Sequence, residues 1–424
     1  MPEIALCIAG VVERGIWSWW QPAQGASGEA MNVAIALGEG RGFAGAFGAG
    51  HGATAHLLPP GPAMAGLVYG WLPPRSPGAE AILAAWSIGL AIATYMLLYR
   101  ALGHLQVPRR ARLAALAIGL LVPAYFTLET VDFRVWEGGL ASALTALFLE
   151  RVIAAHRRLA GERGAASHRA SRFPLVPIGC ACLLFCVNPV LGMGAFACLT
   201  MLGIMLLSPR ANIVGSGIAL GLLAIAIVPW TVRNYHALGA IVPLRSNAGL
   251  ELALANNRAM LDTTDPSRAL EHRLRAIHPT ANARVRAEVV RIGEVAYARR
   301  LGAEAERWIA DNPGSVARLW SRHVRQMLFP DRWITDPRHS LGGSVRAVVI
   351  QLIGVAGLAG LALLLGRRRQ DGAVYPAVLI VTVIVLLAPF QPVSRYTYSL
   401  YPMLCLISSG LILVLDRYRS TQVS

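Results

Sequence analysis

Acidic and arginine side chains recur in the polar segments that separate the apolar runs of this chain. Glu29 opens a short helical pattern, Arg134 and Glu137 lie three residues apart, and Arg233 follows an apolar run over residues 213–228. A carboxylate can take the proton of a hydroxyl, and a guanidinium can bind a phosphate through two parallel N–H donors. Together, these groups could activate a hydroxyl beside a lipid phosphate.

The apolar runs define the elements that must position these side chains. Of the 424 residues, 55% are hydrophobic and 15% are charged, and the mean hydropathy is +0.51. Several runs are long enough to cross a bilayer, so we expect an all-α polytopic membrane protein with about ten transmembrane helices. The predicted spans cover residues 80–100, 111–129, 132–150, 174–187, 189–207, 212–230, 343–365, 374–390 and 397–415, with a partial first helix over 4–12.

The basic residues predict how these spans are oriented. All 39 of them are arginines, and we interpret the net charge of +16 as topology, with no nucleic-acid partner. Arginine-rich loops lie at 109–112, 151–172, 210, 367–369 and 417–419. The positive-inside rule makes these loops cytoplasmic and places the alternate segments on the outer face. Those outer segments are 29–60, 129–134, 188–189, 231–342 and 391–395.

This pattern divides the chain into three parts. Residues 1–232 form an N-terminal transmembrane module with a catalytic first outer loop at 21–60, and residues 343–424 supply the C-terminal transmembrane helices. Residues 233–342 form an outer, mainly helical segment, in which amphipathic patterns predict one helix over 283–310 and another from Asn312-Pro313. We expect outer juxtamembrane helices and a helical periplasmic cap.

Polar residues from separate outer segments are expected to share one cavity, because ionisable groups at a membrane boundary are costly unless they are paired or functional. They are Glu29, His51, His56, Glu129, Asp132, Arg134, Glu137, Arg233, Asn234, Arg245, Asn247, Glu251, Asn256, Asn257 and Arg395.

Structural interpretations of the main candidates stay open. Glu29 could simply be a charge favoured by the dipole at a helix N-terminus. Arg134 and Glu137 could form a salt bridge on one helical face. Arg233 and Arg395 could anchor helices at the headgroups rather than bind a phosphate.

Cofactor signals are weak. The six cysteines lie in apolar runs without zinc-type spacing or a disulfide framework. The segment Gly38-Glu-Gly-Arg-Gly42 lacks the strand-turn-helix context of a nucleotide site, and His56 beside Pro59-Pro60 is typical of a loop histidine. We predict no cofactor: a divalent metal ion is compatible with these residues but is not indicated, since arginines can neutralise a phosphate leaving group.

The order of several motifs resembles that of bacterial membrane glycosyltransferases of the GT-C superfamily, in the family 39 or dolichyl-phosphate-mannose mannosyltransferase-like group. The central motif is Pro229-Trp-Thr-Val-Arg-Asn234, followed by Val242-Pro-Leu-Arg-Ser-Asn-Ala-Gly-Leu-Glu-Leu252 and Asn256-Asn257. Further similar motifs are Glu29 to Phe43, Thr54 to Pro60, Arg134-Val-Trp-Glu137, Val187-Asn-Pro189, Glu294-Val-Ala-Tyr297 and Arg395-Tyr396.

The resemblance implies a function for several of these residues. Such enzymes transfer a sugar from a polyprenyl-phosphate donor to an acceptor on the outer face of the membrane, here the bacterial inner membrane. Glu29 would be the catalytic acid or base and Glu137 the second acidic residue, whereas Arg233 and Arg395 would hold the carrier phosphate. Substrate contacts are also predicted for His56, Arg134, Asn234, Arg245, Asn256 and Asn257.

Two other classes of function remain open. A polysaccharide polymerase or ligase would pair outer arginines with a lipid diphosphate but would consume a whole oligosaccharide. A non-enzymatic transporter or assembly partner for lipid-linked sugars would need no carboxylate facing the arginines. The sugar and the acceptor, whether glycan, lipid or protein, are left open.

Overall fold

The computed structural model describes residues 2–20, 28–48, 50–166, 170–335, 341–368 and 372–412. Helices dominate these residues, and the β contacts found among them are two isolated bridges, Ala44 with Ala53 and Ala170 with Leu207. The predicted all-α class is therefore confirmed.

Long apolar helices make this a multi-pass membrane protein. Among the described residues, five helices are long and apolar enough to span a bilayer, and the bent pair α5–α6 would bring the number to six. The five are α4 (Pro77–His104), α7 (Gly138–Ala166), α9 (Pro189–Leu206), α10 (Pro209–Leu238) and α18 (Leu341–Arg368). The predicted count of about ten stays a prediction, because other predicted spans form shorter helices. These are α8 (Leu175–Val187), α19 (Val374–Leu387) and α21 (Tyr401–Ile407).

The predicted span at 111–129 is divided. Helix α5 (Arg109–Leu121) and the following turn, α6 (Phe126–Thr130) with the 3-10 helix η1 (Asp132–Arg134), meet at an angle of 71°. The division at Asn188-Pro189 is confirmed, since Asn188 caps α9 by accepting a hydrogen bond from the Leu191 amide.

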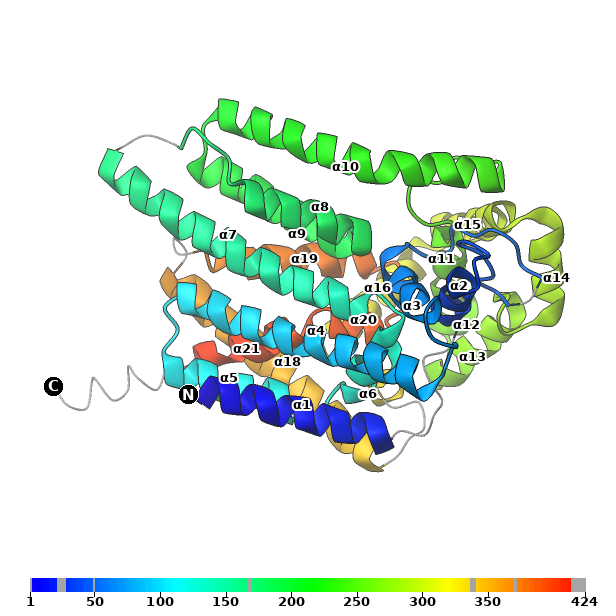
Figure 1. Cartoon of the computed structure of the whole chain (residues 1–424), viewed down its shortest axis with the longest axis horizontal. Helices are drawn as coiled ribbons and strands as arrows, with labels where there is room; N and C mark the ends of the chain where they lie inside the picture. The colour runs from blue at the N-terminus through cyan, green and yellow to red at the C-terminus, as the bar shows by residue number, and fades with distance from the viewer. Residues whose placement is uncertain are drawn as a thin grey trace.

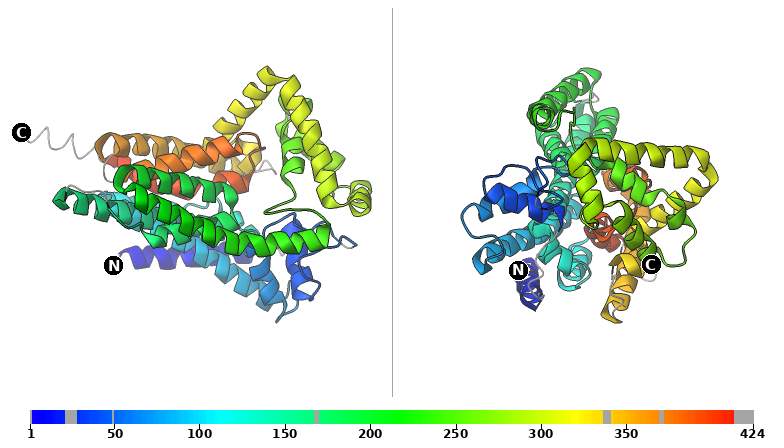
Figure 2. Two further views of the ribbon diagram at one scale, coloured as in Figure 1. Left: turned by 90° about the horizontal axis from the view of Figure 1, so that it is seen from above. Right: turned by 90° about the vertical axis from the view of Figure 1, so that its right-hand side faces the viewer.

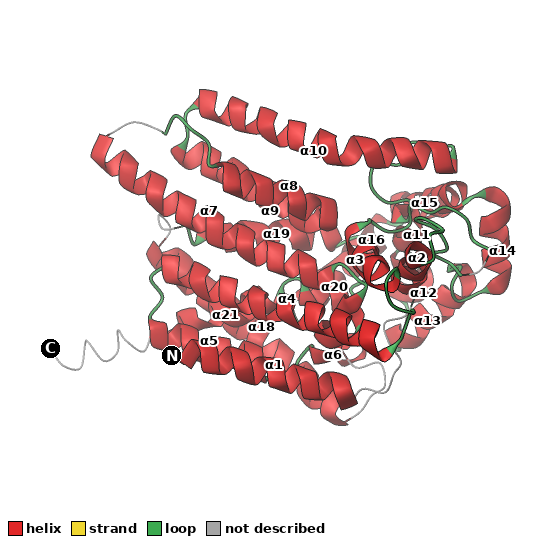
Figure 3. Cartoon of the chain, in the orientation of Figure 1, coloured by secondary structure: helices red, strands yellow, loops and turns green. Residues whose placement is uncertain are grey.

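The long helices run side by side, and the polar segments gather at one end of the bundle (Figures 1 and 3). Helices α2 (Glu29–Gly38) and α3 (Pro60–Tyr69) lie at that end, together with α11 to α16 (Figure 2). The arginine-rich loops around residues 109–112 and 210 lie at the opposite end (Figure 1). The arginines at 417 and 419 lie outside the described residues. The segments predicted to share one face therefore do share one end of the bundle.

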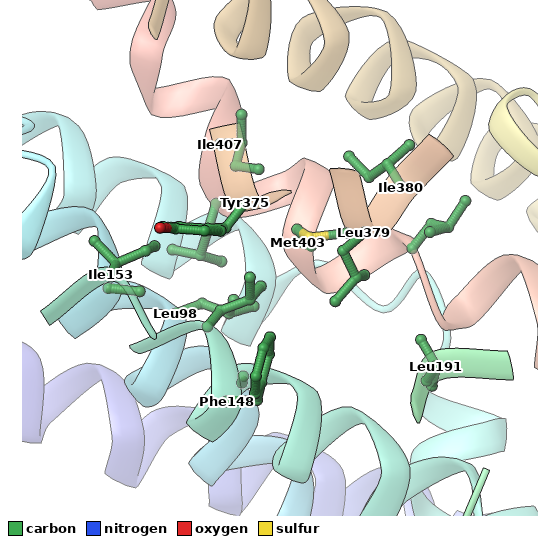
Figure 4. Close-up of a cluster of buried hydrophobic side chains, with 14 of the residues drawn as sticks. Leu98, Phe148, Ile153, Leu191, Tyr375, Leu379, Ile380, Met403 and Ile407 are labelled. Carbon is green, nitrogen blue, oxygen red and sulfur yellow. The ribbon is translucent and has the colours of Figure 1, made fainter. Parts of the chain in front are cut away.

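Large side chains fill the centre of the bundle, as Figure 4 shows around Tyr375 and Leu379 of α19. Leu98 of α4, Phe148 of α7 and Met403 of α21 belong to the same buried cluster. Helix α10 differs: Ile213, Leu220 and Ile225 are among its many exposed apolar residues, as expected for a helix facing lipid.

Six helices of the cap lie between α10 and the short helix α17 (Arg332–Thr335). They are α11 (Ala248–Ala255), α12 (Arg258–Leu261), α13 (Pro266–Ile277), α14 (Ala283–Ile292), α15 (Glu294–Asp311) and α16 (Pro313–Leu328). The single helix predicted over 283–310 is wrong, since Gly293 with a φ of 87° divides α14 from α15. Helix α11 packs closely on α15, because a Cβ at Gly249 would lie 2.1 Å from the Ala298 carbonyl oxygen. This contact holds α11 at the wall of the site described below.

The N-terminal helix α1 is longer than its apolar run suggests. The sequence predicted a partial helix over residues 4–12, but α1 runs from Pro2 to Trp20 through Glu13 and Arg14. Arg14 is buried and contacts Glu129, so Glu129 also lies inside the bundle rather than in an open outer loop. The charged residues that appeared to end the first helix are thus part of its packing.

Candidate functional site

A cavity of about 300 Å³ lies where the outer end of the bundle meets the cap. Its wall combines the start of α2, the turn before α7, the segment leading into α11, the end of α13 and the loop before α20 (Ser394–Tyr398). Its ionisable residues are Glu29, His56, Glu137, Arg245, Glu251, His278 and Arg395. The predicted shared cavity thus exists for five of the ten predicted site residues, namely Glu29, His56, Glu137, Arg245 and Arg395.

The three carboxylates of the cavity differ in their partners. Glu137 accepts a hydrogen bond of 2.6 Å from Arg245. Burial opposes ionisation of Glu137, but Arg245 outweighs burial and lowers the pKa of this carboxyl. Glu29 lies 3.4 Å from Nε2 of His278. For Glu251, no hydrogen bond or ion pair of the carboxylate is found among the described residues.

Burial raises the pKa of the Glu251 carboxyl; Arg395 opposes this shift, and the charge of Glu29 adds to it. A carboxyl with a raised pKa in a cavity is suited to general acid–base chemistry. Glu137 and Arg245, by contrast, neutralise each other.

Arg395 is held flat in the cavity by an aromatic ring. Its guanidinium carbon lies 3.6 Å from the centroid of the Trp136 ring. Such stacking orients a guanidinium while leaving its N–H donors at the edge of the plane. Arg395 can therefore offer a planar pair of donors to an anion.

Two buried histidines face Glu29. His56 belongs to the first outer loop, and His278 follows the last residue of α13. One ligand atom from each of Glu29, His56 and His278 can be chosen so that all three lie within 4.8 Å of one another. Burial lowers the pKa of both imidazoles, and for His56 the charges of His278 and Arg245 add to this effect. Burial therefore favours the neutral form of both rings.

The other five predicted site residues do not line the cavity, and their polar atoms bind protein groups. Arg134 does not pair with Glu137; it donates to Glu80 at 2.6 Å and to Ser18 at 2.8 Å. Arg233 donates to the carbonyl oxygens of Thr54 and Phe43, so it fastens the first outer loop to the end of α10.

The three asparagines outside the cavity have similar structural contacts. Asn234 is fully buried and donates to the Val242 carbonyl at 2.8 Å. Asn256 donates to the Pro389 carbonyl and accepts from Trp320. Asn257 caps α12 by accepting from the Met260 amide. The central sequence motif around these residues thus holds the cap on the bundle.

Glu294 is a buried anchor that the sequence reasoning did not identify. Its carboxylate accepts hydrogen bonds of 2.6 Å from the Thr54 hydroxyl, 2.6 Å from the Ala55 amide and 2.9 Å from the Ser246 hydroxyl. These bonds join α15 to the first outer loop immediately before His56. Glu294 therefore positions one wall of the cavity without lining it.

His278 was not predicted as a site residue, and Glu251 was predicted only as one of the many polar residues of the shared cavity. Glu251 stood among the polar residues of the outer segments, but nothing in the sequence separated it from its neighbours. His278 lies 222 positions after His56, and only the folding of the cap brings the two rings to a centroid distance of 6.2 Å. The only signal for His278 was a histidine directly after an amphipathic helix.

The buried histidines predict that stability falls on acidification. Burial lowers the pKa of His51, His56 and His278 below the ordinary value of 6.5. Below pH 6.5 the unfolded chain therefore binds more protons than the folded chain, and each histidine contributes up to about 1.4 kcal/mol per pH unit. We expect the unfolding temperature of the detergent-purified protein to fall between pH 6.5 and 5 and to level off above pH 7.

The exposed His272 provides a matched control for this measurement. The unfolding temperature of His272→Gln should depend on pH as that of the wild type does. The unfolding temperature of His56→Gln should fall less steeply between pH 6.5 and 5. An unfolding temperature that does not change between pH 5 and 7 would contradict the lowered pKa of the buried histidines.

Comparison with known proteins supports the fold. No protein-family model and no curated protein matches the sequence. Among solved structures, the chain is similar to the oligosaccharyltransferase of Archaeoglobus fulgidus. The complex of this protein, AglB, with an inhibitory peptide and a dolichol-phosphate is 13% identical with a TM-score of 0.51. The apo form is 13% identical with a TM-score of 0.52, and the complex with zinc and sulfate is 12% identical with a TM-score of 0.50.

These matches cover 99% of this chain but 49% to 51% of the archaeal chains, so the chain spans about half of their length. At this level of identity the similarity concerns the fold. The chain shares its helical membrane fold with the archaeal protein, whereas the GT-C, family 39 and mannosyltransferase-like assignment stays a prediction.

Proposed function

We propose that the protein is a membrane glycosyltransferase that moves a sugar from a polyprenyl-phosphate donor to an acceptor hydroxyl in the cavity. The observation that carries this proposal is the cavity itself. There, Glu29 and Glu251 face Arg245 and Arg395 at one end of a bundle of membrane-spanning helices. The fold shared with an oligosaccharyltransferase supports the same class of reaction.

The proposed reaction needs one base and one group that stabilises the leaving phosphate. The acceptor oxygen attacks C1 of the sugar with inversion, and its proton passes to Glu251 or Glu29. The bond between C1 and the phosphate oxygen breaks, and the new charge on the polyprenyl phosphate faces Arg395. Trp136 keeps Arg395 in plane, so the guanidinium need not reorient as the charge develops.

The orientation of the site is part of the proposal. The arginine-rich loops at the far end of the bundle favour a cytoplasmic location for that end, and this supports a cavity that opens on the outer face of a bacterial inner membrane. A donor whose polyprenyl chain lies in the bilayer can then present its phosphate and sugar to the cavity.

The other two classes of function are less well supported. A transporter or assembly partner would need no acid opposite the arginines, but the cavity has two carboxylates beyond the ion pair of Glu137 with Arg245. Transfer of a whole oligosaccharide remains the second candidate, since the structural neighbours are oligosaccharyltransferases. The identity of the donor separates it from the transfer of a single sugar.

Transfer from a panel of radiolabelled donors tests the proposal. Membranes with the wild-type protein should move label from at least one polyprenyl-phosphate sugar to an endogenous acceptor. The variant Arg395→Gln should lose about 10²–10³-fold of this rate, as when one donor to a developing anion is removed. The variant Arg284→Gln, at an exposed site on α14, is the matched control and should retain the wild-type rate.

Two results would overturn the proposal. One is no transfer from any polyprenyl-phosphate donor by a folded wild-type protein. The other is transfer only from lipid-diphosphate oligosaccharides, which would establish the polymerase or ligase alternative.

A further inference from the structure

The cavity has more carboxylates than guanidiniums, although its proposed substrate is an anionic phosphate. Its wall holds three carboxylates, Glu29, Glu137 and Glu251, but two guanidiniums, Arg245 and Arg395. One guanidinium is already neutralised, because Arg245 pairs with Glu137. An anionic lipid phosphate would therefore enter a site with no excess of guanidiniums over carboxylates. Additional positive charge would favour binding of the donor and departure of its phosphate.

We propose that Glu29, His56 and His278 bind a divalent cation of the zinc type at this end of the cavity. The three side chains come from three separate segments, the start of α2, the first outer loop and the residue after α13. Two imidazole nitrogens and one carboxylate oxygen form a typical three-ligand set that leaves a further coordination position open for water or substrate. This inference deepens the proposed function and rests on it only for the role of the cation in catalysis.

The distances between the three ligand atoms are compatible with metal binding after a small inward shift of the His56 ring. Ligands at about 2.0–2.1 Å around a tetrahedral ion lie about 3.4 Å from one another. Glu29 Oε1 and His278 Nε2 are already 3.4 Å apart. The full set spans up to 4.8 Å, so the His56 ring must move inward by somewhat more than 1 Å. The cavity provides the space for this shift, because His56 lies in its wall.

A neighbouring threonine can fix the protonation of His278. Its Nδ1 atom lies 2.7 Å from the Thr280 hydroxyl, and the Thr280 amide N–H donates to Nδ1 at 3.3 Å. With a metal ion on Nε2, the ring proton would lie on Nδ1, which would donate to the Thr280 hydroxyl and give up its longer contact with the amide. A metal-binding histidine is commonly oriented by such a contact at its other nitrogen. Thr280 is therefore the positioning residue of the proposed site.

The two proposed imidazole ligands lie in a largely apolar environment. His56 and His278 are 5% and 6% exposed, so water is largely excluded from both rings. Phe47 packs against both, with ring centroids at 4.8 Å and 6.3 Å. A cation bound here would lower the pKa of a coordinated acceptor hydroxyl and would supply the missing positive charge.

Zinc binding to the detergent-purified full chain, produced without a histidine tag, tests the inference by isothermal titration. The wild type should bind one equivalent of Zn²⁺. His278→Ala should lose more affinity than the about 10–100-fold that removal of an outer contact costs, and Thr280→Val should lose an amount within that range. His272→Ala, on the helix that precedes His278, is the matched control because His272 is exposed, and it should bind zinc as the wild type does.

A second readout covers the case in which His278→Ala does not fold. X-ray absorption of the zinc-loaded wild type should show only nitrogen and oxygen ligands, with the scattering pattern of two imidazoles. No zinc binding by the wild type, unchanged binding by a folded His278→Ala, or a spectrum without imidazole would each overturn the inference.

These measurements need no turnover, so they separate the cation site from the proposed function. Zinc binding without sugar transfer from any donor would retain the site and reject the transferase. Sugar transfer by a chain that binds no zinc would retain the transferase and reject the site.

Discussion

Replacing Glu251 with glutamine should lower sugar transfer by about 10²–10⁴-fold, the usual contribution of a positioned general base. Glu251 is the carboxylate of the cavity for which no hydrogen bond or ion pair is found among the described residues, whereas Glu137 pairs with Arg245 and Glu29 faces His278. A free carboxylate can turn toward the acceptor hydroxyl without breaking a protein contact. Glutamine has nearly the same shape and cannot accept the proton.

The pH dependence of transfer identifies the base. Burial raises the pKa of Glu251, and the charge of Glu29 adds to this effect. The wild-type rate should therefore fall on the acidic side at a pH above the ordinary pKa of a glutamate. Glu29→Gln removes a negative charge near Glu251. The remaining transfer rate of this variant should therefore fall at a lower pH than the wild-type rate.

Comparison of Glu29→Gln with Glu251→Gln separates their roles. Glu29→Gln should also reduce transfer to a small residual rate, either because Glu29 shares the proton or because it holds the proposed cation. Only Glu29→Gln should weaken zinc binding. Glu39→Gln, at the exposed end of α2, is the control and should keep the wild-type rate and pH profile. Full activity of Glu251→Gln with an unchanged acidic limb would show that Glu251 is not the base.

Much of the fold could be predicted because it follows from hydrophobicity and local signals. Apolar runs predicted α4, α9, α10 and α18, and the arginine-rich loops predicted which ends of the helices lie together. The predictions failed where a helix depends on a partner far away in the sequence. Helix α1 continues through Glu13 and Arg14 because Glu129 receives the charge, and no local pattern contains that information.

The site was predictable only as a region. Glu29, His56, Glu137, Arg245 and Arg395 line the cavity as expected. Arg233 and Arg134 have the same residue type and similar positions at helix ends, yet both bind protein groups. Whether a guanidinium faces a carbonyl or a cavity depends on the path of distant loops. The spacing of residues along the chain does not record that path.

The buried ion pair of Arg14 and Glu129 should be the most important single polar contact for stability. Their side chains are 0% and 1% exposed, and Arg14 Nε lies 2.7 Å from Glu129 Oε2. Tyr398 also donates to Glu129, at 2.9 Å. Removing one partner leaves the other charge buried without compensation, which costs about 3–5 kcal/mol. We expect Arg14→Met to lower the free energy of unfolding by this amount and to reduce the yield of folded protein.

Arg14 also binds backbone carbonyls at the bend between α5 and α6. Its guanidinium donates at 2.6 Å to the carbonyl oxygen of Leu120 and at 3.3 Å to that of Gly119, at the end of α5. Such terminal carbonyls have no partner within their own helix. Glu129→Gln retains these hydrogen bonds from Arg14 to the end of α5. It should therefore destabilise the protein less than Arg14→Met. The double variant should be more stable than the sum of the two losses predicts, because the lost ion pair is counted only once.

A second ion pair joins α1 to α5, near the first residues of both helices, and serves as an internal control. Arg109 of α5 contacts Glu3 of α1 at 2.8 Å, but the Arg109 side chain is 58% exposed. An exposed pair contributes about 0–1 kcal/mol, so Arg109→Met should change the unfolding midpoint little. Strictly additive losses at Arg14 and Glu129, or equal losses at Arg14 and Arg109, would contradict a buried, coupled pair. A large coupling found only at the buried pair would establish that α1, despite its charged residues, is joined to the bundle by charge as well as by apolar packing.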